Sequence, residues 1–145
     1  MPHRAALGVA TALALAFAAP AQDTGKKDQE ALQGTWKVTK MVVNGKAAPD
    51  NLVQKITLTV EGDLLTVYLD KSKLEEVQYT LDAGTKPRRM DWTVLSGPDK
   101  GQKRLAIYDL QGDQLKLHRL AGSQAAEKRP DNFDGDVMIL ERVKK

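Results

Sequence analysis

The sequence predicts an all-β protein, a single antiparallel, up-and-down β-barrel of about eight strands. After residue 32, most of the chain consists of short runs in which apolar and polar residues alternate, the period of a strand with one buried face. Turn residues such as Gly62-Asp63 and Gly112-Asp113 separate these runs at the spacing of about 8–12 residues that is typical of sandwiches and barrels. A meander of this kind exposes two edges unless its first and last strands pair, so the pattern favours a closed barrel.

The first expected strand, residues 33–43, begins with Gly34-Thr35-Trp36. Trp36 and Val38 alternate with Lys37, which places the tryptophan on the buried face. A glycine beside a large aromatic residue lets another piece of backbone approach closely. One short helical turn is expected within residues 47–54, where Asp50 or Asn51 would cap it.

The remaining strands are expected from the same alternation, and each is bounded by a turn signal. They cover residues 55–61, 65–69, 76–81, 90–94, 105–107, 115–117 and 136–143. The clearest hairpin joins 105–107 to 115–117 through a glycine-aspartate turn. With 145 residues, of which 41% are hydrophobic, the chain suits one domain with an ordinary core.

The N-terminus reads as an export signal. Residues 1–21 combine a positive start at Arg4, an apolar run and a small-residue cleavage site at Ala19-Pro20-Ala21. Residues 22–31 are polar and are expected to form a flexible leader, with the barrel domain at 32–145. The apolar run is shorter than a membrane span, so no membrane insertion is expected after signal removal. The chain has no cysteine, so neither disulfides nor lipid attachment after the signal is expected. The protein is therefore expected in a periplasm or outside the cell.

Composition argues against several function classes. The formal net charge of +3 is spread over the chain, and aromatic residues at 5% are too sparse for stacking nucleic-acid bases, so no nucleic-acid partner is expected. His118 has no second ligand type nearby, and the aspartates at 131, 134 and 136 are ordinary turn residues, so neither predicts a metal. No catalytic motif is present, and we expect neither an enzyme nor a cofactor.

Several motifs point to a family. Gly34-Thr35-Trp36 with Arg142 resembles the lipocalin and fatty-acid-binding superfamily of closed β-barrels. The whole mature chain is more similar to the small exported lipocalin-like domains, of no established activity, that are abundant in planctomycete bacteria. The motifs that carry this likeness are Leu32-Gln33-Gly34-Thr35-Trp36, Gly97-Pro98 to Gly101, Ile107-Tyr108-Asp109-Leu110-x-Gly112-Asp113-x-Leu115-Lys116-Leu117 and Arg129-Pro130-x-x-Phe133.

The resemblance implies that Trp36 plugs one end of the barrel and that Arg142 packs across it beside Gly34. Fatty-acid-binding proteins hold a carboxylate with an arginine and a tyrosine in the last strand. The matching positions here are Met138 and Leu140, which cannot bind a carboxylate. The resemblance therefore implies a fold and no particular ligand.

Two functions remain open. The first is a non-catalytic binding module for a small, mostly apolar ligand, bound at the end away from Trp36 near Tyr68, Tyr79, Met90 and Trp92. Tyr68 is the weakest member of this set, because it falls on the opposite face from its apolar neighbours. The second is a cell-envelope or extracellular interaction protein, with an unknown protein partner, whose barrel is filled by its own side chains.

Overall fold

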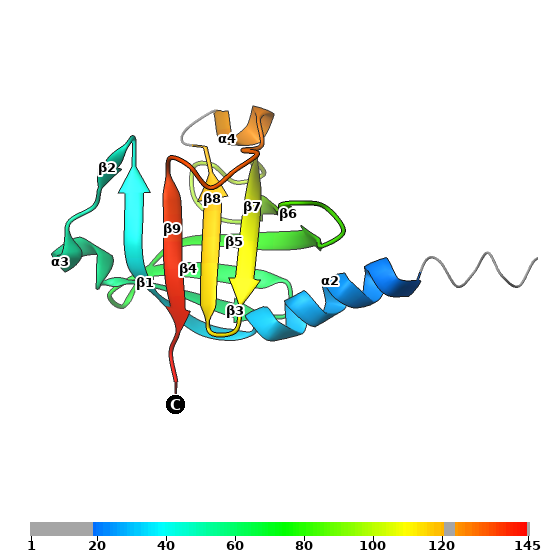
Figure 1. Cartoon of the computed structure of the whole chain (residues 1–145). Helices are drawn as coiled ribbons and strands as arrows, with labels where there is room; N and C mark the ends of the chain where they lie inside the picture. The colour runs from blue at the N-terminus through cyan, green and yellow to red at the C-terminus, as the bar shows by residue number, and fades with distance from the viewer. Residues whose placement is uncertain (1–18, 121–123, 145) are drawn as a thin grey trace, which may run out of the picture.

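The structure is a computed structural model that describes residues 19–120 and 124–144 (Figure 1). Eight antiparallel strands form one closed barrel, in which β9 returns to pair with β1. The first four are β1 (Gly34–Val43), β3 (Ile56–Glu61), β4 (Leu64–Leu69) and β5 (Ser72–Asp82). The others are β6 (Arg88–Val94), β7 (Lys103–Gln111), β8 (Gln114–Arg119) and β9 (Val137–Arg142). The predicted antiparallel barrel of eight strands is confirmed.

One short strand and two short helices lie outside the eight strands of the barrel. The two-residue strand β2 (Lys46–Ala47) extends the end of β1 across a turn at Asn44 and Gly45, both with positive φ. Helix α3 (Asp50–Val53) is the short helix expected after the first strand, and it buries Val53. Helix α4 (Gln124–Glu127) packs against β7 (Figure 1).

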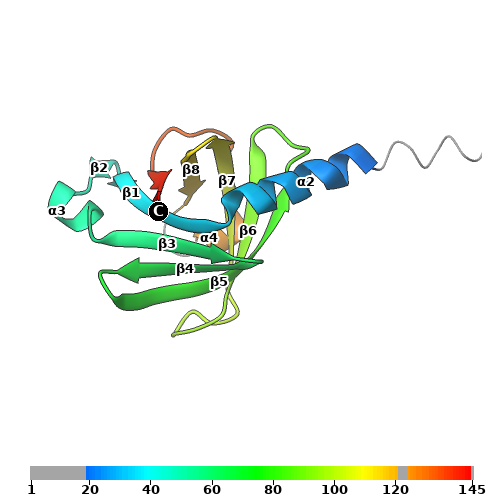
Figure 2. The same cartoon turned by 90° about the horizontal axis from the view of Figure 1, so that it is seen from below.

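The segment that precedes the barrel, where a flexible leader was expected at residues 22–31, is a helix. Helix α2 (Ala19–Leu32) covers this segment and ends just before Gly34, whose φ of +119° breaks the helical conformation. Its alanine, glutamine, lysine and glutamate residues favour a helix, and contacts with the barrel from Asp28 onward stabilise it. Figure 2 shows that only its C-terminal part touches the barrel.

The predicted export signal lies mostly in residues 1–18, outside the described residues. Residues 19–21, including the predicted cleavage site, begin α2. Within the part of the chain that the structure describes, no helix is long and apolar enough to cross a membrane.

Apolar side chains fill the barrel interior as the alternation of the strands requires. The strands β3, β4 and β5 cross the others at a steep angle, so the two halves of the sheet enclose one core (Figure 1). Its largest fully buried members are Trp36, Tyr108, Leu32, Leu58, Leu65, Met90, Leu115 and Leu140. Packing of this kind is dense and holds the strands in one register.

Candidate functional site

The barrel contains two tryptophan–arginine pairs, one toward each end. Arg142 lies over the Trp36 ring with its central carbon 4.4 Å from the ring centroid. Arg119 lies over the Trp92 ring at 5.5 Å. We call the end with Trp36, α2 and the turns at Gly62 and Gly112 the closed end. The far end is formed by the end of β8 at Arg119, the start of β7 at Arg104, and the inward side chains beside them.

At the closed end, every polar group of the first pair has a partner. Trp36 is fully buried, and its indole Nε1–H donates to the Leu32 carbonyl at 2.9 Å. Arg142 donates to the Gln33 and Ala31 carbonyls and to Asp113, with distances of 2.7 Å to Gln33 and 3.0 Å to Asp113. Because Trp36 and Arg142 are also register partners across β1 and β9, this pair closes the barrel. A Cβ at Gly34 would lie 3.5 Å from the Arg142 guanidinium, so the glycine leaves room for it.

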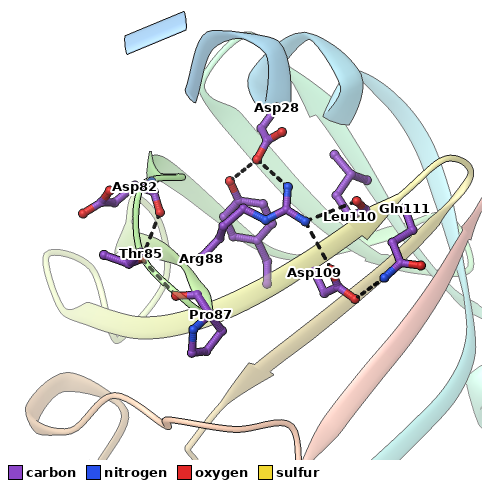
Figure 3. A network of polar contacts seen from close by, with 10 residues as sticks. Asp28, Asp82, Thr85, Pro87, Arg88, Asp109, Leu110 and Gln111 are labelled. Carbon is purple, nitrogen blue, oxygen red and sulfur yellow. Dashed lines mark hydrogen bonds and ion pairs between the residues drawn. The ribbon is translucent and has the colours of Figure 1, made fainter. Parts of the chain in front are cut away.

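One carboxylate of helix α2 attaches it to β6 and β7 (Figure 3). Asp28 accepts a hydrogen bond from the Tyr108 hydroxyl at 2.6 Å and forms an ion pair with Arg88 at 2.9 Å. Arg88 also pairs with Asp109 at 3.2 Å. Burial raises the pKa of Tyr108, and the hydrogen bond to Asp28 and the charge of that carboxylate raise it further. Burial would lower the pKa of Arg88, but the hydrogen bond and charge of Asp28 outweigh it, so the pKa rises.

Tyr79 also belongs to the closed end. Its hydroxyl donates to the Gly62 carbonyl at 2.6 Å. The Gln33 side-chain amide accepts from the Gly62 N–H at 2.7 Å and donates to the Gly62 carbonyl at 3.0 Å. Burial raises the pKa of Tyr79, which keeps the hydroxyl a donor. These bonds fix the β3–β4 turn against the start of β1.

The far end carries charged side chains inside the barrel. Arg104 is 8% exposed and faces Trp92 across β6 and β7. Its guanidinium lies 2.5 Å from Glu75 and 2.9 Å from Asp99, so both arms of the fork hold a carboxylate. Arg104 is therefore neutralised.

Arg119 and Trp92 are not satisfied in this way. Among the described residues, no carboxylate lies within ion-pairing distance of Arg119, and its hydrogen bond is a long one of 3.4 Å to the Leu120 carbonyl. Burial lowers the pKa of Arg119, the Arg104 charge lowers it further, and Glu75 opposes both. Trp92 is 4% exposed, and its Nε1–H has no hydrogen-bond partner within the described part of the chain. Asp91 Oδ1, a second buried atom without a hydrogen bond, lies 2.6 Å from Arg129 and so has an ionic partner.

Inward-facing apolar residues of the far end remain partly exposed. Met41 and Met138 are register partners across β1 and β9, while Val67 and Leu69 occupy the end of β4. All four pack against the core cluster without being fully buried. The far end therefore combines accessible apolar side chains with a cation and a free donor.

The structure brings two of the residues predicted to bind a ligand together, because Tyr79 and Trp92 are register partners across β5 and β6. From this position the Tyr79 hydroxyl reaches Gly62 at the closed end, whereas Arg119 of the far end stacks on the Trp92 ring. Met90 is fully buried in the core, between Arg88 and Trp92 on β6. Tyr68 pairs with Thr57, in the outward-facing set of β3 and β4 residues, and is partly exposed. Strand tilt causes the difference, because residues paired across strands lie at different heights along a tilted barrel.

Sequence reasoning missed the two inward arginines. Leu115, Leu117 and Arg119 alternate on one face of β8, and this period was a signal that Arg119 points inward. Arg104 lies two residues before the buried Ala106 on β7, so the same alternation turns it inward. His118, on the other face, is buried and its Nδ1 lies 2.7 Å from the Asn132 carbonyl, while Asp136 accepts from the backbone N–H groups of the β1–β2 turn.

Grooves at the closed end lie away from the unpaired groups. One of about 560 Å³ separates α2 from β5 and is bordered by Lys26, Gln29, Tyr79 and Leu81. Another of about 690 Å³ runs past Gly34, Glu61 and Arg142. The buried polar groups beside both grooves already have partners, as described above for Tyr79 and Arg142. We therefore take the far end as the candidate site.

Comparison with known proteins adds no identification. The chain matches no family model, no curated protein and no solved structure among those compared.

Proposed function

We propose that the protein is an exported, non-catalytic binding module that takes a small, mostly apolar ligand at the far end of its barrel. The observation that carries this proposal is the buried Trp92 Nε1–H, which has no partner among the described residues and lies beside Arg119. An unsatisfied buried donor costs about 1–3 kcal/mol, and such groups are few in native proteins. A ligand that brings an acceptor would remove this cost.

The architecture supports a site at the far end. A barrel of eight strands is just wide enough for its own side chains or one small ligand. Large side chains such as Trp36, Leu115 and Leu140 occupy the closed half, and α2 covers its end. The far half offers Met41 and Met138, whose flexible thioether chains adapt to ligands of different shape.

Export and family membership are part of the same proposal. The N-terminal pattern of residues 1–21 supports export to a periplasm or the extracellular space. The lipocalin-like barrel, with Arg142 over Trp36 beside Gly34, supports membership of the planctomycete-type exported domains. Intact-mass analysis of exported protein should give a chain that begins at Gln22, and a mass that retains residues 1–21 would contradict the export signal.

Tryptophan emission tests the binding site, because the chain has only two tryptophans. Trp36→Phe leaves Trp92 as the sole emitter, and Trp92→Phe leaves Trp36 as the matched control. Apolar probes drawn from lipids, sterols and aromatic compounds should change the emission of the first variant and leave that of the second unchanged. Unchanged emission of Trp92 with all probes would contradict the proposal and favour the filled barrel of an interaction protein.

A further inference from the structure

We infer that the ligand is an amphiphile with one anionic head group, a carboxylate or a phosphate monoester, held by Arg119 and the Trp92 indole N–H. This inference rests on the proposed function and names the class of ligand for the same site. It begins with the charges around the two side chains.

The two inward arginines differ in their counter-charges. Arg104 holds both Glu75 and Asp99, and the Glu75 carboxylate is its partner at 2.5 Å. Arg119 has no carboxylate at ion-pairing distance among the described residues. Residues 1–18, 121–123 and 145 contain no aspartate or glutamate, so no acidic side chain outside the described residues is available to pair with it. The far end thus holds two inward arginines, and both of the carboxylates that form ion pairs there are bound to Arg104.

A half-buried guanidinium without a counter-ion is unfavourable. Desolvation of an ion costs several kcal/mol when no opposite charge compensates it. Perturbed charges of this kind collect at functional sites, where the bound ligand supplies the compensation. An anionic ligand group would neutralise Arg119 and accept from the Trp92 N–H at once.

The chemistry of the two groups selects an anion. Arginine has five N–H donors in a planar fork, and the indole has a single N–H donor, so neither can accept a hydrogen bond. Two donors on adjacent side chains therefore call for an acceptor with several lone pairs, which carboxylates and phosphates have. The stacking of Arg119 on the Trp92 ring orients its donors.

The neighbouring apolar residues indicate that the ligand also has an apolar portion. Met41, Met138, Val67 and Leu69 face the same end of the barrel and are partly exposed. An aliphatic chain laid against them would lose contact with water while its head group stays at Arg119. These positions and charges together describe a small amphiphilic anion.

Calorimetric titration of the mature protein with four decyl compounds tests the inference. The probes are decanoate, decyl phosphate, decanol and decyltrimethylammonium, each below its micelle concentration. A charge-assisted bond predicts that at least one anion binds about ten- to a hundredfold more tightly than decanol. The stronger of the two anions identifies the preferred head group.

Two methionine variants locate the anion. Arg119→Met should bring the anion's affinity down to that of decanol. Lys103→Met removes the same charge from an exposed position next to Arg104, and it should leave the affinity unchanged. Thermal unfolding confirms that both variants are folded.

The outcomes separate this inference from the proposed function. Equal affinities for decanol and the anions would overturn the anionic head group and leave the apolar binding site in place. A loss in Lys103→Met as large as that in Arg119→Met would place the anion on the surface and overturn the assignment to Arg119. Lack of binding by all four probes would overturn both the head group and the proposed function.

Discussion

Each end of the barrel has a tryptophan stacked with an arginine, but the two pairs differ in how fully their polar groups are hydrogen-bonded. Each has a tryptophan with a guanidinium over its ring, at 4.4 Å for Trp36–Arg142 and 5.5 Å for Trp92–Arg119. At the closed end the indole N–H and the guanidinium have protein partners. At the far end the indole N–H has none among the described residues, and the arginine has one weak bond.

This difference distinguishes a structural pair from a binding pair. Hydrogen bonds that are completed within the chain stabilise the fold and leave nothing for a ligand. Buried donors without an acceptor lower the stability of the free protein and gain a partner when a ligand binds. Functional sites often show this exchange of stability for function. The predictions below test the comparison from the largest effect to the smallest.

The largest effect is expected at Trp36. Trp36→Ala removes a fully buried indole that joins α2, β1 and β9, and it should lower the free energy of unfolding by about 3–5 kcal/mol. Denaturant midpoints measure the loss. A midpoint equal to that of the parent would show that the closed end does not organise the fold.

The two arginines should respond in opposite directions to methionine. Arg142→Met removes charged hydrogen bonds to Asp113 and two backbone carbonyls, and we expect a loss of about 1.5–3 kcal/mol, toward the lower figure because a quarter of the side chain is exposed. Arg119→Met removes an uncompensated charge and should leave stability unchanged or raise it by about 1 kcal/mol. Urea unfolding of both variants measures the contrast, and a larger loss for Arg119→Met would reverse our assignment.

Phenylalanine tests the indole N–H groups alone. Trp36→Phe leaves the buried Leu32 carbonyl without its donor, whereas Trp92→Phe breaks no hydrogen bond within the described residues. Both variants lose similar volume, so Trp36→Phe should be less stable by about 1–2 kcal/mol. Equal losses in thermal or chemical unfolding would mean that Trp92 Nε1–H also has a partner.

High pH should weaken the attachment of α2. The pKa of Tyr108 is raised in the folded state, so the unfolded chain ionises first, and stability falls as the pH rises above the ordinary tyrosine value of about 10. Each such group contributes a loss of at most about 1.4 kcal/mol per pH unit. Unfolding from pH 9 to 11 should show a shallower fall in Tyr108→Phe than in the parent. Tyr68→Phe, on the outer face, is the control, and an equal effect of both variants would contradict the role of Tyr108.

The barrel could be predicted from the sequence because its signal is local. Alternation and turn residues set the strands. The stacked pair of Trp36 and Arg142 that closes β1 on β9 was instead implied by the resemblance to closed lipocalin-like barrels. Helix α2 was not predicted, because its docking depends on Asp28 meeting Arg88 and Tyr108 from distant strands. Polar composition alone suits a flexible segment and a solvent-exposed helix equally.

The site was only partly predictable for a related reason. Alternation correctly placed Tyr79 and Trp92 on inward faces, but it gives no height along the barrel axis, and Tyr79 lies toward the closed end. Arg104 and Arg119 did not stand out in the sequence, because arginine is rarely buried. Their different pairing depends on Glu75, which continues the inward alternation of Val77 and Tyr79 on β5, but alternation alone does not show which arginine it meets.

One spectrum tests the central claim, that the closed pair is complete and the far pair awaits an anion. The two indole N–H groups give separate nuclear magnetic resonance signals in protein labelled with nitrogen-15, and Trp36→Phe assigns them. Titration with decanoate should move the Trp92 signal downfield, as a hydrogen bond to an anion requires, while the Trp36 signal stays in place. Movement of the Trp36 signal by a similar amount, or of neither signal, would contradict the account.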